Sequence, residues 1–600
     1  MNFSENCLGI DIVRTASQDQ QNRGENMIKF NDIKYERLDY DKTRIMIADL
    51  LDKLISCNDF ECYIEVVKKI IGIQNYIEEM CDYADIRNMR NSEDEYYKNE
   101  IDFWNSNKVK FDSLFLPFYN ELNNSRFKEQ LINVLPSNFF RIVEYQERIT
   151  SDSIADLIKL ENELKIQYRN LNKTKIMFDG EEKTISAISG LFSNKDRNIR
   201  KKAHDAVNDF YYSKKSEYDN ILFELITIRN QIAKKLGYNN YVEYSLFKLK
   251  RFDYNYDDIS SFRNNIIKYI TPICKLMSEW QKEELRLDEL KYYDTVFFSS
   301  MPESKYIDIE LLKQLKESFQ KCDADLSNLF NTMLDNGYID FIQRDNKVNF
   351  SITNYLTETC MPVVTGNFKN NYLDVQTTTH EVGHSFQKYC ASIEDKKNIV
   401  SPLLKYPTME VAEMFSYSME LIMMNYVDNI FDKEDYKKYC FMKMYNLIAN
   451  LPYICLVDEF QERLYSNTNL KIEDIRKTWL LLVDKYNLKK SNSGHINLDN
   501  GGYFYRQSHI YLDPFYYIDY ALSYFGAFSI WNKCEDNLDL FKEVGGVASY
   551  YSFKELIDKY NMPNPFDEKT VEEVSKKLKK ELENKSLVRS WSKWMKIKLI

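Results

Sequence analysis

Two histidines stand four residues apart around a glutamate in the segment His380–Glu381–Val382–Gly383–His384, in a chain with only five histidines. Residues four apart share one face of a helix, so both imidazoles can bind one metal ion. Glu381 then lies beside the open side of the metal, where a carboxylate can take a proton from water. The spacing therefore predicts a catalytic metal site.

This segment must be helical for the two imidazoles to meet. Asp374 precedes the run of residues 375–379 and can cap the amide groups of a helix start. The run includes three threonines, which are poor helix formers, and Gly383 costs about 1 kcal/mol relative to alanine. Tertiary packing must therefore hold the helix, and we interpret Gly383 as clearance for a second helix or an aromatic ring.

A catalytic zinc ion usually has three protein ligands, so a third ligand must follow the two histidines. A predicted helix over residues 407–420 carries three carboxylates on one stripe of otherwise apolar side chains: Glu410, Glu413 and Glu420. Buried carboxylates need a partner or a metal ion. The helix is therefore the expected donor, although the spacing leaves Glu410 and Glu413 as alternatives, with a solvated acidic face as the simpler reading.

Taken together, HEVGHSFQ at residues 380–387 and PTMEVAEMFSYSMEL at residues 407–421 resemble the thimet oligopeptidase/oligoendopeptidase F group of zinc metallopeptidases. The likeness is greatest to the bacterial oligoendopeptidase branch. Residues 505–531, YRQSHIYLDPFYYIDYALSYFGAFSIW, are similar to the substrate-binding segment of that group. The resemblance covers most of residues 30–595.

The resemblance implies one zinc ion per chain, bound by His380, His384 and Glu413. Glu413 is favoured over Glu410 because Glu413-Met-Phe-Ser, followed by Glu420, matches the register of the ligand helix in the group. Glu410 then becomes a candidate acceptor for a ligating imidazole. Glu381 is expected to be the general base that activates a zinc-bound water for attack on a peptide carbonyl.

The oxyanion that develops during this attack needs hydrogen-bond donors besides the metal. The resemblance points to His509 and Tyr516 as these catalytic donors, and to Tyr517 and Tyr520 as substrate-binding residues. The tyrosine register stays open by one residue. Any single tyrosine here also has the simpler interpretation of a core aromatic whose hydroxyl finds a partner.

Residues 348–352 and 361–368 are among the few strand-like runs, and we expect them to form a small sheet ahead of the metal-binding helix. An extended peptide can add to the edge of such a sheet through backbone hydrogen bonds. Gly366 would then allow the substrate backbone to approach closely.

Only 15 glycines and 11 prolines interrupt the 600 residues, which favours long helices. We expect a mainly α-helical fold, with the small sheet beside the zinc-binding helix. The resemblance implies a large two-part clamshell around a deep channel that admits short peptides. We predict an N-terminal helical domain over residues 1–190 and a zinc metallopeptidase catalytic domain over residues 191–600, with a soft boundary.

The net charge of −11 and the lack of a basic stripe disfavour nucleic acid as a partner. No run of 18 apolar residues and no secretory signal pattern is seen, so we expect no membrane association. Eleven cysteines without paired short spacings favour a reducing, cytoplasmic compartment. The sequence does not indicate an oligomeric state.

The predicted function is zinc-dependent hydrolysis of internal bonds in short peptides. One alternative is a zinc metallocarboxypeptidase, in which Arg506 would bind the free carboxylate of the substrate. A second alternative is a non-catalytic peptide-binding protein of the same fold. Glu381 argues against this second alternative, because a pure binder does not need a carboxylate beside the metal.

Overall fold

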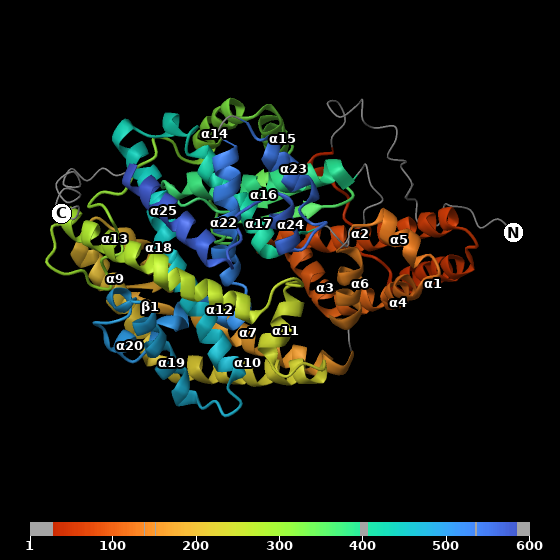
Figure 1. Cartoon of the computed structure of the whole chain (residues 1–600), viewed down its shortest axis with the longest axis horizontal. Coiled ribbons are helices and arrows are strands. Elements are labelled where there is room, and N and C mark those ends of the chain that lie inside the picture. Colours follow the sequence, from red (N-terminus) through yellow and green to blue (C-terminus); the bar gives the residue numbers. More distant parts are fainter. Residues whose placement is uncertain (1–27, 137, 150–151, 396–405, 535–536, 585–600) are drawn as a thin grey trace.

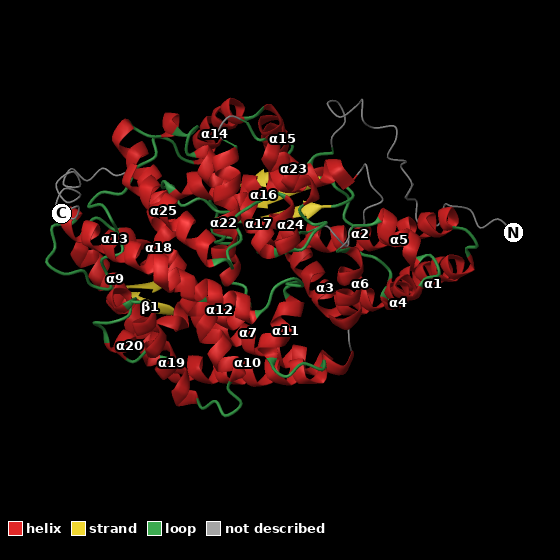
Figure 2. Cartoon of the chain, in the orientation of Figure 1, coloured by secondary structure: helices red, strands yellow, loops and turns green. Residues whose placement is uncertain are grey.

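The computed structural model describes residues 28–136, 138–149, 152–395, 406–534 and 537–584, and these are almost entirely helical (Figures 1 and 2). The predicted mainly α-helical fold with small sheets is confirmed. The first helices are α1 (Tyr40–Ser56), α2 (Phe60–Arg90), α3 (Glu95–Ser113), α4 (Leu116–Asn124), α5 (Lys128–Val134) and α6 (Phe139–Ile149). They lie together at the right of Figure 1, in red and orange.

The middle of the chain contains two strands among seven helices. These elements are α7 (Ala155–Asn172), β1 (Lys175–Phe178), β2 (Glu181–Thr184), α8 (Ile185–Ser189), α9 (Arg197–Ser213), α10 (Lys215–Lys235), α11 (Tyr241–Lys248), α12 (Tyr256–Asn265) and α13 (Thr271–Glu284). Strands β1 and β2 pair antiparallel as a separate hairpin.

The remaining elements include the second sheet and α18, the longest helix of the described residues. They are α14 (Asp308–Cys322), α15 (Ala324–Asp335), β3 (Ile339–Asp340), β4 (Ile352–Leu356), β5 (Met361–Thr365), α16 (Leu373–Asp395), α17 (Met409–Met423), α18 (Lys433–Ser466), α19 (Ile472–Lys485), α20 (Ile496–Asp499), α21 (Ser508–Leu512), α22 (Ile518–Lys533), α23 (Asp539–Val547), α24 (Phe553–Lys559) and α25 (Glu568–Asn584).

Two hydrophobic cores divide the protein. Helices α1–α6 form their own core with Tyr550, while the larger core is built from α7 onward with a few residues of α2. The predicted boundary near residue 190 falls inside the larger core, between α8 and α9. Cys57, at the end of α1, and Cys62, in α2, form a disulfide that was not predicted from the sequence.

Strands β3, β5 and β4 form the small sheet expected near the metal-binding helix, with β5 in the centre. Strand β5 runs parallel to β3 and antiparallel to β4, and all five of its residues are buried. The predicted sheet is confirmed, but β4 begins at Ile352, so residues 348–351 precede it. Gly366 follows the central strand, and a Cβ there would lie 2.6 Å from the ring of Phe341. Internal packing against Phe341 is therefore sufficient to explain a glycine at this position, without reference to a substrate.

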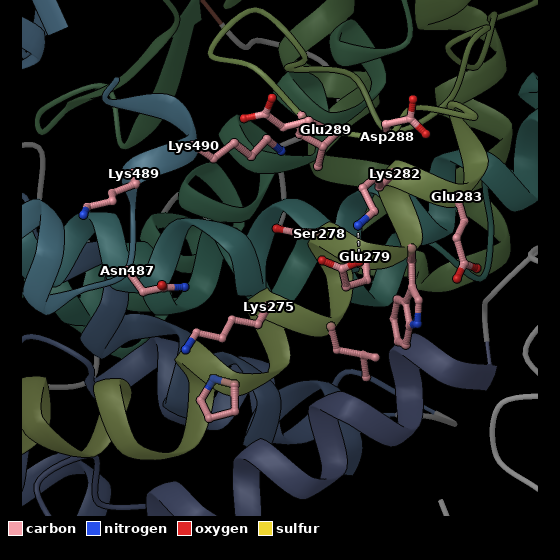
Figure 3. A pocket seen from close by; sticks show the side chains of 14 residues that line it. Lys275, Ser278, Glu279, Lys282, Glu283, Asp288, Glu289, Asn487, Lys489 and Lys490 are labelled. Carbon is pink, nitrogen blue, oxygen red and sulfur yellow. Dashed lines mark ion pairs between the residues drawn. The ribbon is translucent and has the colours of Figure 1, made fainter. Parts of the chain in front are cut away.

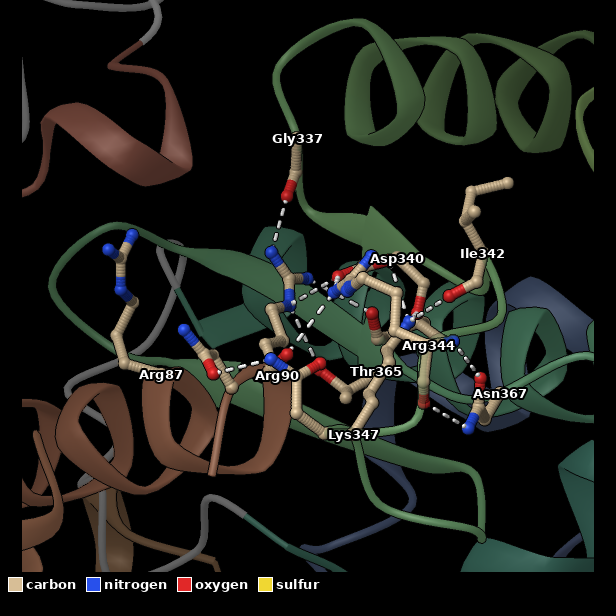
Figure 4. A network of polar contacts seen from close by, with 12 residues as sticks. Arg87, Arg90, Gly337, Asp340, Ile342, Arg344, Lys347, Thr365 and Asn367 are labelled. Carbon is tan, nitrogen blue, oxygen red and sulfur yellow. Dashed lines mark hydrogen bonds and ion pairs between the residues drawn. The ribbon is translucent and has the colours of Figure 1, made fainter. Parts of the chain in front are cut away.

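Helix α2 holds both ends of the β4–β5 hairpin. At the open end, the Arg90 guanidinium donates to Thr365 Oγ1 and to the carbonyls of Gly337, Tyr338 and Val364, at 2.8–3.1 Å (Figure 4). At the turn, the Glu79 carboxylate accepts from the amide and hydroxyl of Thr359. The N-terminal helices thereby position the sheet.

Helix α18 has the length and composition of a membrane span, and it is the only such helix among the described residues. However, 72% of its most apolar window is buried inside the protein. A position in the core of a large fold accounts for its apolar composition, because a helix that is packed on all sides is apolar all round.

Candidate active site

The two helices of the predicted metal site pack closely because of Gly383. A Cβ at this position would lie 2.7 Å from Cα of Ser416 and 2.9 Å from the carbonyl oxygen of Phe415, both on α17. Real Cβ atoms do not approach backbone so closely, so the predicted role of Gly383 as packing clearance is confirmed. The close approach of α17 brings its carboxylates to the histidines of α16.

The predicted cap of the helix that carries His380 and His384 is wrong. Helix α16 begins at Leu373, so Asp374 lies in its first turn rather than before it. The Asp374 carboxylate instead accepts from the backbone amides of Lys369 and Asn371, at 3.0 and 3.1 Å. It therefore holds the loop that leads from β5 into the helix.

The structure brings His380, His384 and Glu413 together, with one ligand atom of each within 4.8 Å of the others. Glu413 Oε2 lies 3.4 Å from His380 Nε2 and 3.8 Å from His384 Nε2. Two imidazole nitrogens and one carboxylate oxygen fit a catalytic zinc site, which uses three protein ligands. Glu410 lies on the same helix but accepts a hydrogen bond from Tyr254, at 3.1 Å.

Glu420 orients the first histidine. Its Oε1 lies 2.7 Å from His380 Nδ1, and its other oxygen contacts Lys443 of α18. The expectation that Glu410 accepts from a ligating imidazole is therefore wrong. Glu420 is seven residues from Glu413 and shares its stripe of the helix. Burial alone would raise the pKa of Glu420, but Lys443 and His380 hold it below its usual value.

Thr353 of β4 fixes the predicted general base. Its hydroxyl donates to Glu381 Oε2 at 2.6 Å, and the base is 5% exposed. Burial raises the pKa of Glu381, while the charge of His380 and the Thr353 hydrogen bond oppose the rise. A carboxylate with a raised pKa is a stronger base, as proton abstraction from water requires.

Tyr516 contacts the cluster through Glu413, and the His509 ring lies beside Tyr516. The Tyr516 hydroxyl donates to Glu413 Oε1 at 3.1 Å. Burial, and to a lesser extent the negative charge of Glu413, raise the pKa of Tyr516. Burial lowers the pKa of His509. Gln507 Nε2 lies 2.7 Å from His509 Nδ1, so a neutral imidazole carries its proton on Nε2 and can donate there.

Tyr517 and Tyr520 complete this aromatic group. The His509 ring lies 4.8 Å from Tyr517, 5.7 Å from Tyr516 and 6.0 Å from Tyr520. The structure therefore brings the four predicted residues of the segment together. Gly366, the other predicted substrate-binding residue, belongs to a different segment and lies one residue beyond the end of β5.

Sequence reasoning missed the group that fixes Tyr516. Phe515 has a left-handed backbone, with φ of +67°, which is strained for a bulky side chain. Arg251 donates to the Phe515 carbonyl at 2.8 Å, and Gln461 accepts from its amide at 3.0 Å. Arg251 also contacts Asp519. Arg251 lies more than 250 residues earlier in the chain, so no local motif could reveal this contact.

A separate pocket of about 820 Å³ lies between α13 and residues 487–490 (Figure 3). Its charged lining is partly self-paired, as in the 2.6 Å contact between Lys282 and Glu279. The lining contains no histidine, cysteine or tyrosine. The pocket lining therefore offers no imidazole or thiol ligand for a metal ion.

The fold and the His–His–Glu cluster together define a metallopeptidase. Residues 191–553 match Peptidase family M3, and residues 30–150 match the Peptidase M3 N-terminal domain. The chain belongs to peptidase family M3, and the resemblance to its oligoendopeptidase F group is confirmed.

Two curated relatives carry oligopeptidase names. The chain is 22% identical over 273 residues to an oligoendopeptidase F homolog of Mycoplasma genitalium. It is 26% identical over 271 residues to oligopeptidase PepF of Bacillus subtilis. These matches cover 43% and 44% of this chain, but only 42% and 38% of the two relatives.

Solved structures match over nearly their full length. The structure of PZ peptidase A with an inhibitor is 30% identical, with a TM-score of 0.86, covering 93% of this chain and 100% of the other. A protein of Bacillus anthracis assigned to oligoendopeptidase F is 28% identical, with a TM-score of 0.81, covering 93% of this chain and 99% of the other.

Proposed function

We propose that this protein is a zinc-dependent oligoendopeptidase that hydrolyses internal bonds of short peptides. The observation that carries the proposal is the convergence of His380, His384 and Glu413 beside Glu381. A pair of imidazoles and a carboxylate suits zinc, and a fourth position would stay open for water or substrate. We also propose that it works in the cytoplasm on peptides rather than on nucleic acid or membranes.

The mechanism assigns each side chain one task. When bound, zinc acidifies water and polarises the scissile carbonyl. Glu381 takes the proton of the attacking water and passes it to the leaving amine. Tyr516 and His509 donate hydrogen bonds to the carbonyl oxygen as negative charge develops there. Tyr517 and Tyr520 line the path of the peptide next to these donors.

A peptide library analysed by mass spectrometry tests the proposal. We expect cleavage inside peptides, including those with an amidated C-terminus, and loss of cleavage with a chelator. Circular dichroism should show an unchanged helical fold in chelator, because the large core does not depend on a catalytic ion. Activity with no bound transition metal by elemental analysis would contradict the metal assignment.

Amidated peptides also separate the carboxypeptidase alternative, which requires a free C-terminal carboxylate. In the structure, the Arg506 side chain turns toward α9, where Nη2 donates to Asn208 at 2.6 Å. Its contacts in the described residues are with Asn208, Tyr211 and Tyr503, and none of them is with the His–His–Glu cluster, where a carboxypeptidase must hold the terminal carboxylate near the scissile bond.

A further inference from the structure

A row of tyrosines leads away from the metal ligands. We call it the aromatic track, and it consists of Tyr417, Tyr520, Tyr517, Tyr453 and Tyr503, each partly exposed. Starting from His380, successive ring centroids are 5.4, 6.3, 5.6, 6.1 and 5.8 Å apart. Partly exposed aromatic rings offer large apolar contact area to a peptide without selecting its sequence.

Arg506 lies at the end of the aromatic track. Its guanidinium is 4.5 Å from the ring centroid of Tyr503 and 5.7 Å from that of Tyr211. Its Nη2 donates a single hydrogen bond to Asn208, and its Nε is buried without a hydrogen-bond partner. No ion pair joins Arg506 to a carboxylate of the described residues.

Other arginines of the same core have carboxylate partners. Arg229 lies 2.8 Å from Glu161, Arg263 lies 2.8 Å from Asp458, and Arg251 contacts Asp519. The acids of α9 on either side of Asn208 have other partners. Asp205 pairs with Lys201 at 2.5 Å, and Asp209 with His495 at 3.2 Å. Arg506 therefore keeps a planar donor group suited to a carboxylate that the protein itself does not supply.

We propose that Arg506 binds a carboxylate of the peptide substrate at the far end of the aromatic track, several residues from the scissile bond. This inference rests on the proposed function and adds a substrate class to it: short peptides with a correctly spaced carboxylate. An extended peptide rises about 3.3 Å per residue, so each ring-to-ring step of the track spans about two residues at most. The carboxylate is either the C-terminus or an acidic side chain.

The test uses one internally quenched peptide in three forms: a free C-terminal acid, a C-terminal amide, and the amide with glutamate as its last residue. For wild-type protein we expect the KM of the plain amide to exceed that of the acid by about tenfold, since the amide loses the charge-assisted hydrogen bond to Arg506. Arg506→Gln should remove this difference and leave kcat within about twofold. Arg506→Lys should keep part of it.

Arg169→Gln serves as a matched control, because Arg169 is exposed on α7 and the same charge is lost. It should retain the wild-type preference. If the glutamate-containing amide regains the low KM, an acidic side chain can supply the carboxylate. If only the free acid does, the source is the C-terminus. Both outcomes support the inference.

Peptide length gives a second readout. Two residues added between the cleavage site and the carboxylate should shift the cleavage site by two residues in wild-type protein and not in Arg506→Gln. Equal KM for all three forms in wild-type protein would overturn the inference while leaving the proposed function intact. A uniform loss of kcat with a lowered melting temperature in Arg506→Gln would overturn it as well, in favour of a structural role. No cleavage of any form would refute the proposed function itself.

Discussion

The proposed metal ligands and the proposed base are supported by two different regions. On the helix side, formed by α16, α17 and α18, Glu420 joins the proposed ligand His380 to the buried Lys443. On the hairpin side, formed by α2 and the β4–β5 hairpin, Thr353 holds Glu381 through its hydroxyl group. Charged groups position His380, the proposed ligand, whereas a neutral hydroxyl positions Glu381, the proposed base. We therefore expect substitutions on the helix side to weaken metal binding, and substitutions on the hairpin side to slow proton transfer, each without the other effect.

The largest expected effect comes from the base. Glu381→Gln keeps the shape of the side chain but removes its proton affinity, so kcat/KM should fall by about 1000-fold or more. Bound zinc, measured by elemental analysis, should stay near one per chain. Glu413→Ala should instead lose the metal, and Glu410→Ala should keep it. The reverse result for these two glutamates would show that the ligand register is wrong.

The next effect concerns Tyr516, whose hydroxyl contacts Glu413 on the helix side. Tyr516→Phe removes one hydroxyl and little volume, so kcat should fall about 100-fold while KM changes little. Tyr517→Phe and Tyr520→Phe are matched controls in which kcat should fall much less. A normal kcat with a lowered melting temperature would assign Tyr516 to the core, and the larger kcat loss among the two controls would then identify the donor.

The helix side is tested by Glu420→Gln. Loss of the carboxylate that orients His380 should weaken zinc binding by about 10- to 100-fold, measured by competition with a chelator. This change also leaves Lys443 as a buried charge without its anion, which lowers stability. The double variant with Lys443→Met should recover the melting temperature but not the zinc affinity. Recovery of both would mean that Glu420 acts only through stability.

The smallest effect is expected on the hairpin side. Thr353→Val removes the hydroxyl bound to Glu381, and one lost hydrogen bond to a charged group should lower kcat by about tenfold. Thr353→Ser keeps the hydroxyl and should stay close to wild type. Zinc affinity should be unchanged in both. A Thr353→Val variant with weakened zinc binding would show that the two sides are coupled after all.

The predictable part of the site is local. The spacing of His380, Glu381 and His384 has one geometric outcome once the segment is helical, because residues four apart share a face. The same periodicity places Glu413 and Glu420 on one stripe, and the helical character of the chain follows from its few glycines and prolines. Even the close approach of a second helix could be expected from Gly383.

The unpredictable part depends on partners from distant segments. Periodicity could not distinguish Glu410 from Glu420 as the partner of His380, because the choice depends on where Lys443 and Tyr254 lie. Likewise, the cap predicted at Asp374 was wrong because a loop five residues upstream folds back onto its carboxylate.

The sequence by itself determined the candidate reacting groups: the spacing of His380, Glu381 and His384 places two imidazoles and a carboxylate together on a helix, but it left Glu410 and Glu413 as alternatives for the third proposed ligand. The tertiary structure alone decided how those groups are oriented. Thr353, Lys443 and Arg251 come from three separate segments, and each acts on the site through a contact made only after the chain has folded. Burial, which shifts the pKa values of Glu381 and His509, is likewise a property of the packed protein and not of any local motif.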